Sequence, residues 1–163
     1  MATVTTLAKA AGGRGNPGRK PYMVEVEIDL AAAATAKGSA LAANDIIQAI
    51  TVGANTVVMF AGMEIITAPA GGTGCTADLG ITGGDVDAFV DGFTVTGASA
   101  GSYATLANTA CPILVTTSDT IDMLLLGTTP DTSGVIRVYA VLMDVDGMGS
   151  SKAAAEVDRD VLA

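Results

Sequence analysis

Apolar and polar residues alternate from position 22 to position 30, a period of two that is typical of a β-strand. The apolar side chains from Val24 to Leu30 fall on one face of such a strand, and the acidic side chains between them fall on the other. We therefore expect a strand with one buried side and one side in water.

The same alternation, or a short dense run of apolar residues, recurs at intervals of about ten residues. Gly62 interrupts one of these runs and predicts a bulge or a point of close packing. About eight short strands without helical heptads predict an all-β fold, and their even number with unequal loops favours a jelly-roll-like antiparallel β-sandwich. Turn residues separate the further runs, which cover residues 45–52, 55–67, 75–81, 85–93, 112–117, 120–127 and 135–144.

The alanine-rich run 31–36 breaks this pattern directly after the first strand. Alanine has a high helix propensity, but the run is short and no capping residue is evident. We expect a loop or a single turn here, ended by Lys37 and Gly38.

Charge is distributed unevenly between the N-terminus and the rest of the chain. Residues 1–21 hold four bases and no acid, whereas the remainder holds four bases and all seventeen acids, a net charge of −13. A Gly- and Pro-rich segment buries too little apolar surface to offset its loss of backbone entropy, so it needs a surface outside its own domain. We divide the chain into an extended basic arm (1–21), a β-sandwich domain (22–146) and a C-terminal tail (147–163) that could end in a short helix.

The charge pattern also limits the partners. The acidic body would repel phosphate, and the four positive charges of the arm are few for a nucleic-acid-binding surface. We therefore expect no nucleic-acid partner. We favour an acidic protein surface or a neighbouring copy as the partner of the arm. The longest apolar stretch, 55–69, contains Gly62 and Glu64 and is too short to cross a bilayer. The N-terminus lacks the apolar run of a signal peptide. We therefore expect no membrane partner and synthesis in a cytoplasm.

Residue types that most catalytic sites need are missing from the sequence. It has no histidine, which removes the commonest general base and most zinc and copper sites. It also has no nucleotide-binding glycine motif, so we expect neither an enzyme nor a cofactor. Cys75 and Cys111 stand outside any CxxC pattern. We expect both to be reduced, small, buried residues, with pairing as the alternative in an exported protein.

One acidic, glycine-rich stretch superficially resembles a calcium loop. Asp85, Asp87 and Asp91 would supply oxygen ligands, but Phe89 stands where a third ligand should be and no glutamate closes the loop. We favour the interpretation that Asp85 caps a single helical turn, while Phe89 and Val90 plug the edge of the sandwich. A calcium- or carbohydrate-binding module that uses these three aspartates remains an alternative.

Two segments of the body resemble small virion proteins of tailed bacteriophages, including cyanophages. They are the acidic stretch LGITGGDVDAFVDG (79–92) and the late run IRVYAVLMD (136–144). The resemblance covers roughly residues 55–145, leaves the arm outside, and concerns a fold rather than a reaction.

The resemblance implies a jelly-roll capsid decoration (cement) protein that binds the outside of an assembled shell, with a tail, neck or fibre component as the alternative. Its partners would be the major capsid protein and other copies of itself, in a dimer or trimer, and its location would be the virion. The residues expected to contact the shell lie in the arm, where prolines keep the path extended; they are Lys9, Arg14, Pro17, Arg19, Lys20 and Pro21.

Overall fold

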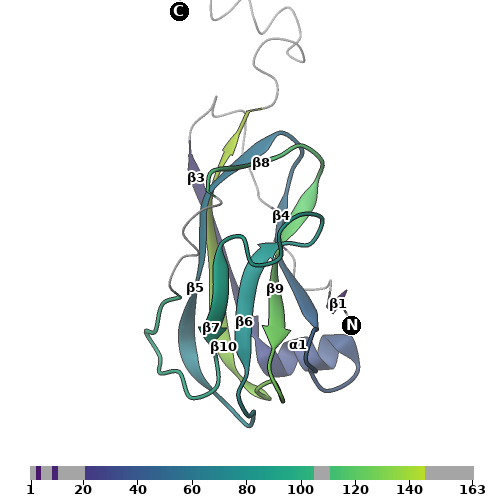
Figure 1. Ribbon diagram of the computed structural model, residues 1–163, viewed down its shortest axis with the longest axis vertical. Helices are drawn as coiled ribbons and strands as arrows, with labels where there is room; N and C mark the ends of the chain where they lie inside the picture. The colour runs from purple at the N-terminus through teal and green to yellow at the C-terminus, as the bar shows by residue number, and fades with distance from the viewer. Residues whose placement is uncertain (1–2, 5–8, 11–20, 105–110, 146–163) are drawn as a thin grey trace, which may run out of the picture.

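The alternating segments of the body form eight strands that pack as two facing sheets (Figure 1). The computed structural model describes residues 3–4, 9–10, 21–104 and 111–145. The body strands are β3 (Tyr22–Asp29), β4 (Ile46–Val52), β5 (Thr56–Ala70), β6 (Thr76–Ile81), β7 (Val90–Thr94), β8 (Ile113–Val115), β9 (Asp119–Leu126) and β10 (Ser133–Asp144).

The order of the strands confirms the predicted jelly roll. One sheet runs β3-β10-β5-β8 and the other β4-β9-β6-β7, and all neighbours among these eight strands are antiparallel. Numbered from one to eight along the chain, the body strands are ordered 1-8-3-6 and 2-7-4-5, so consecutive strands mostly alternate between the sheets, as in two interleaved Greek keys. We call them the β10 sheet and the β9 sheet after their central strands.

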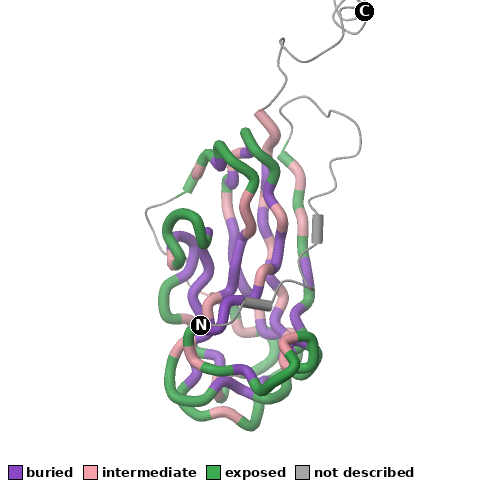
Figure 2. The backbone as a smooth tube through the Cα atoms, turned by 90° about the vertical axis from the view of Figure 1, so that its right-hand side faces the viewer, coloured by how far each residue is buried: buried purple, intermediate pink, exposed green. Residues whose placement is uncertain are grey.

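The core lies between the sheets and runs along their whole length (Figure 2). The expected inward face of β3 is confirmed, since Val26 and Ile28 are buried while the acidic residues between them are exposed. Phe89 and Val90 are also buried, as expected of residues that plug the edge. Because apolar burial stabilises by roughly 25 cal/mol per Å², this continuous layer is the main source of stability.

The alanine-rich run forms a helix, so the prediction of a loop or single turn was wrong. Helix α1 spans Leu30–Lys37 and ends at Gly38, whose φ of 79° is left-handed. Asp29 caps its N-terminus, because its carboxylate accepts hydrogen bonds from the amides of Ala31 and Ala32 at 2.8 and 3.1 Å. The sequence pattern places Asp29 at the last polar position of a strand, and in the structure it is also the N-cap of α1.

Gly62 is a point of close packing, as predicted. A Cβ atom there would lie 2.7 Å from the hydroxyl oxygen of Tyr139 on β10. Glycine therefore lets the tyrosine ring lie directly over β5.

Two short segments of the arm pair with the body itself. β1 (Thr3–Val4) and β2 (Lys9–Ala10) run parallel to β4, with Thr3 opposite Ile46 and Lys9 opposite Ile50. An edge strand offers unpaired backbone groups, and these segments use them. The expectation that the arm needs a surface outside its own domain is therefore wrong for these four residues. The predicted tail (147–163) lies outside the described residues.

Candidate interaction surfaces

The outer face of the β10 sheet is apolar over one half of its length. Val141 on the central strand pairs with Met23 on β3 and Phe60 on β5. The register of β5 and β10 shifts at this point, so that Met59 and Phe60 both fit between two buried positions of β5. Such a bulge turns two consecutive side chains to the same side of a sheet. Met59 is 40% exposed as a result.

A second apolar row lies next to the first, toward the end of β10. Val57 on β5 pairs with Met143 on one side and Leu114 of β8 on the other. Met23 and Leu114, at opposite edges of the sheet, are 61% and 52% exposed. We call the two rows together the apolar half; its members are Met23, Val57, Met59, Phe60, Leu114, Val141 and Met143.

The other half of the same face carries charge. Arg137 of β10 forms ion pairs with Glu27 of β3 at 3.0 Å and Glu64 of β5 at 3.2 Å, and its Nε lies 3.8 Å from Glu25. The hydrogen bond to Glu27 raises the pKa of the arginine further above its usual value. These four residues form what we call the charged half, in which three carboxylates surround one guanidinium. Arg137 is thus a cross-strand partner of residues on both neighbouring strands.

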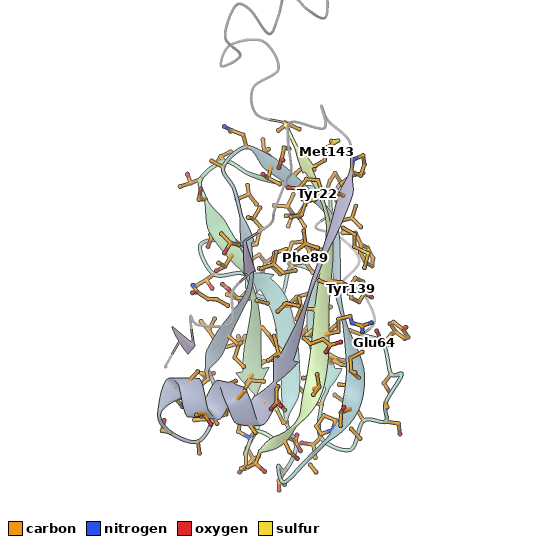
Figure 3. All side chains as sticks on the ribbon, turned by 180° about the vertical axis from the view of Figure 1, so that it is seen from behind. Tyr22, Glu64, Phe89, Tyr139 and Met143 are labelled. Carbon is orange, nitrogen blue, oxygen red and sulfur yellow. The ribbon has the colours of Figure 1, made fainter. Side chains whose placement is uncertain are left out.

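Tyr139 separates the two halves. Its ring stacks against Phe60 with centroids 5.8 Å apart and an angle of 28° between the planes, a geometry that favours aromatic pairs. Tyr139 and Glu64 extend from the outer side of the sheet, whereas Phe89 lies between the sheets (Figure 3). The face therefore changes from apolar to acidic along the strands, with an aromatic pair at the boundary.

Sequence reasoning missed this surface although β10 carries a signal for it. The inward residues of β10 alternate with Val135, Tyr139, Val141 and Met143, which are also largely apolar. A strand that is apolar on both sides is typical of a strand covered on both faces.

The residues predicted to contact the shell are only partly described. Lys9 belongs to β2 and pairs with Ile50, and Pro21 is exposed directly before β3. The other four, Arg14, Pro17, Arg19 and Lys20, lie outside the described residues, so their contacts stay a prediction.

The acidic stretch does not form the predicted helical turn. Residues 82–89 form turns between β6 and β7. The hydrogen bond between Asp87 and Asp85 raises the pKa of Asp87, and the charge of Asp91 adds a smaller effect. Across residues 21–104 and 111–145, the structure contains no group of three acidic, cysteine or histidine side chains that could hold a metal ion.

Both cysteines have free thiols, but only one of them is buried as expected. Cys75 lies in the core, and burial raises the pKa of its thiol. Cys111 is exposed, two residues before β8, which corrects the expectation that both are buried. Among the described residues, no helix is long and apolar enough to cross a membrane.

Comparison with known proteins finds similarity of fold alone. No model of a known protein family matches the chain, and no curated protein matches it. A chain in the capsid structure of Ralstonia phage GP4 has a TM-score of 0.62 at 20% identity, covering 90% of this chain and 100% of that one. Chains in the capsid structures of cyanophage Pam1 and Helicobacter pylori bacteriophage KHP30 give TM-scores of 0.52 and 0.50 at 14% and 13% identity, over 82% and 78% of this chain and 91% and 89% of theirs. The resemblance to phage virion proteins is thereby confirmed at the level of the fold.

Proposed function

We propose that this chain is a structural protein of a bacteriophage virion and, within that role, a decoration or cement protein on the outside of an assembled capsid. The observation that carries the proposal is the fold, since 90% of this chain matches the full length of a chain from a phage capsid. The composition supports a binding role, since the sequence has no histidine to serve as a general base.

A cement protein stabilises a shell because it binds the assembled state and not the free subunits, so that its binding energy adds to that of assembly. The basic arm is suited to this task, since it concentrates four bases in 21 residues of a chain that is otherwise strongly acidic. Residues 11–20 lie between β2, which pairs with β4, and Pro21, which directly precedes β3. Ten extended residues span at most about 35 Å, so a segment held at both ends projects at most about half of that from the body, enough to contact a subunit packed beside it.

The proposed shell contacts are Lys9, Arg14, Arg19 and Lys20, with Pro17 and Pro21 keeping the path extended. Once the body is bound, the tethered arm acts at a high effective concentration, so weak charge pairs add to the affinity. The partner that this assigns is an acidic surface of the major capsid protein.

The test is retention on purified heads. A variant with Arg14→Glu, Arg19→Glu and Lys20→Glu should be lost from heads, while the matched variant with Arg14→Lys, Arg19→Lys and Lys20→Arg should remain. Both should keep the circular dichroism of the wild type, because none of the three residues belongs to a strand or to the core that the structure describes. Equal occupancy of the two variants would reject the role of the arm.

Copy number tests the location of the protein independently of the arm. Hundreds of copies per particle on a stained gel are expected of a decoration protein. A dozen copies or fewer would instead place the chain in a neck, tail or fibre, the alternative form of the same virion role. Absence from purified particles would reject both.

A further inference from the structure

We infer that the free edge of β8, with the groove beside it, binds an extended basic segment of the shell protein, which adds to the β10 sheet as a fifth strand. This inference rests on the proposed function and deepens it, because it names a contact made by the body of the chain rather than by its arm. β8 is the last strand of its sheet and pairs on one side only, with β5. It lies at the end of the sandwich opposite to α1 (Figure 1).

The backbone along the free side of β8 offers hydrogen bonds. In an antiparallel pair, every second residue of an edge strand points its N–H and C=O groups away from the neighbouring strand. Apart from the pairing with β5, residues 113–117 form no backbone hydrogen bond with any other described residue. Thr116 and Thr117 are exposed, so the open edge continues past the end of the strand. An extended peptide gains affinity from such groups when it adds to a sheet.

The other sheet shows that this fold accepts extended segments at an edge. There β1 and β2, two residues each, pair with β4, which is the edge strand among the body strands. The edge at β4 is thus already used, whereas the edge at β8 is not paired by any strand that the structure describes.

A groove runs beside the free edge, between the two sheets. It has a volume of about 250 Å³ and is lined by residues 113–117 on one side and by Ile81, Gly83, Gly84 and Asp119 on the other. Small-molecule sites usually have about 300–1,000 Å³, so this groove suits a few side chains of a polypeptide better than a cofactor. The two glycines lack side chains, and so the turn after β6 leaves the groove open.

The lining of the groove favours apolar side chains on the bound segment. Ile81 and Val115 are buried and contribute apolar walls, so a side chain that points between the sheets should be apolar. Leu114 is 52% exposed and pairs with Val57 of the apolar half. An added strand would place its outward side chain next to Leu114 and continue the apolar half by one strand.

Asp119 adds a charge to this description. One of its carboxylate oxygens accepts a hydrogen bond from the amide of Thr120 at 2.8 Å, and the other lies beside Gly83 in the wall of the groove. The described part of the chain provides no ion pair for this carboxylate. A lysine or arginine on the bound segment would complement it, and a basic segment is also attracted by a body whose net charge is −13.

The experiment is an occupancy titration of the full chain on purified heads that lack it. Gly84→Leu fills the groove, yet its Cβ would lie 3.8 Å from the nearest atom, the carbonyl oxygen of Ile81, and its φ is not left-handed, so the sandwich should tolerate it. We expect this variant to raise the dissociation constant at least about tenfold, as loss of a central contact does. Ala40→Leu is the control: it adds an exposed leucine after α1, at the other end of the sandwich, and should stay within about twofold of the wild type.

The charge at Asp119 is tested on the same heads. Asp119→Asn keeps an oxygen for the amide of Thr120 but loses the charge, so it should weaken binding several-fold and reduce the dependence of binding on salt. Asp119→Lys should weaken binding further, because it repels the basic segment. Glu25→Gln is the control: it removes one acid from an exposed position of β3 and should have little effect. Equal effects of Asp119→Asn and Glu25→Gln would reject the basic partner.

Hydrogen exchange tests the addition of a strand directly. The amides of residues 113–117 should exchange at least about tenfold more slowly on heads than in the free chain, whereas those of residues 38–43 should be unchanged. Unprotected amides at 113–117 would overturn strand addition, even if the groove variant bound weakly.

The remaining outcomes separate this inference from the proposed function. A wild type that does not bind heads would reject both, whereas equal binding of the wild type and Gly84→Leu would reject the inference alone. A free chain that dimerises, and does so less as Gly84→Leu, would assign the edge to a second copy and overturn the inference. If Gly84→Leu loses the native circular dichroism, Asp119→Lys and the exchange of residues 113–117 decide.

Discussion

The two sheets share one core, but their outer sides differ. On the β9 sheet, buried carboxylates bind nearby segments. Asp78 of β6 accepts a hydrogen bond from the amide of Gly92 at 2.7 Å, and Asp122 of β9 accepts one from the hydroxyl of Thr82. On the β10 sheet, half-exposed charges pair with one another and exposed apolar side chains lie beside them.

This difference shows two uses of the same kind of strand. Carboxylates on the β9 side hold turns of the chain against the sheet through hydrogen bonds within the molecule. The β10 side keeps a broad surface whose apolar half has exposed fractions of up to 61%. The first arrangement contributes to stability, and the second leaves a surface suited to a partner. The comparison therefore predicts large stability effects on one side of the sandwich and small ones on the other.

The largest effect is expected at Asp45, directly before β4. Its carboxylate is buried and forms an ion pair with Lys37 at the end of α1. It also accepts a hydrogen bond from the amide of Ala42 at 2.8 Å. Asp45→Ala leaves a largely buried lysine without this partner, so the free energy of unfolding should fall by about 3 kcal/mol or more. Urea denaturation measures it. Lys37→Met, Asp45→Leu, which removes both charges, should lose much less, and equal losses would contradict the explanation.

A smaller effect is expected at Gly80 on β6. A Cβ atom there would lie 2.2 Å from the carbonyl oxygen of Asp85, so the turn after β6 packs directly on the strand. Gly80→Ala should lower the free energy of unfolding by about 1–3 kcal/mol, as overpacking does.

Gly53 is the matched control for Gly80. Its Cβ would meet only the hydroxyl of Thr56, at an ordinary 3.6 Å. Gly53→Ala should therefore change thermal stability much less than Gly80→Ala. Similar melting temperatures for the two variants would show that the close approach of the turn to Gly80 does not make the added Cβ destabilising.

How much of this fold the sequence could predict depends on what each residue does. The jelly roll could be predicted because alternation in segments such as 22–30 reports burial directly. The helix could not, because Asp29 serves both as an outward strand residue and as a cap. The pairing of Thr3 and Lys9 with β4 could not either, since a two-residue strand has too short a pattern to recognise.

The candidate surface was missed for a different reason. Alternation of apolar and acidic residues predicts a polar outward face, which is correct for Glu25 and Glu27, but Val141 and Met143 put apolar side chains at outward positions of β10. The bulge that turns Met59 outward depends on the register between β5 and β10, which is a long-range property. Local periodicity shows which residues are apolar, but the pairing of distant strands decides which of them meet on one surface.

The pH dependence of stability tests the β9 side at Asp122. Burial raises the pKa of this carboxyl in the folded protein, and one of its oxygens has no hydrogen-bond partner. The folded state therefore binds a proton more tightly than the unfolded state, so this group favours folding at low pH. That contribution is lost as the pH rises from the ordinary aspartate pKa, about 3.9, through the raised value.

Asp122→Asn removes this titration. We expect urea midpoints of the wild type to fall, relative to those of the variant, as the pH rises through this window. The fall should be smaller than the loss at Asp45, because a partner hydroxyl remains at Thr82. A difference between the two proteins that does not depend on pH would contradict the shift.

The smallest effect is expected in the charged half of the β10 sheet. The side chain of Glu27 is 54% exposed although it pairs with Arg137 at 3.0 Å. Water screens such a pair, and exposed ion pairs contribute about 0–1 kcal/mol. Glu27→Ala should therefore lower the free energy of unfolding by less than about 1 kcal/mol, a small fraction of the loss from Asp45→Ala, measured by urea denaturation in the same buffer. A loss as large as that at Asp45 would mean that the charged half, like the β9 side, holds the sandwich together, and the contrast between the two outer faces would no longer stand.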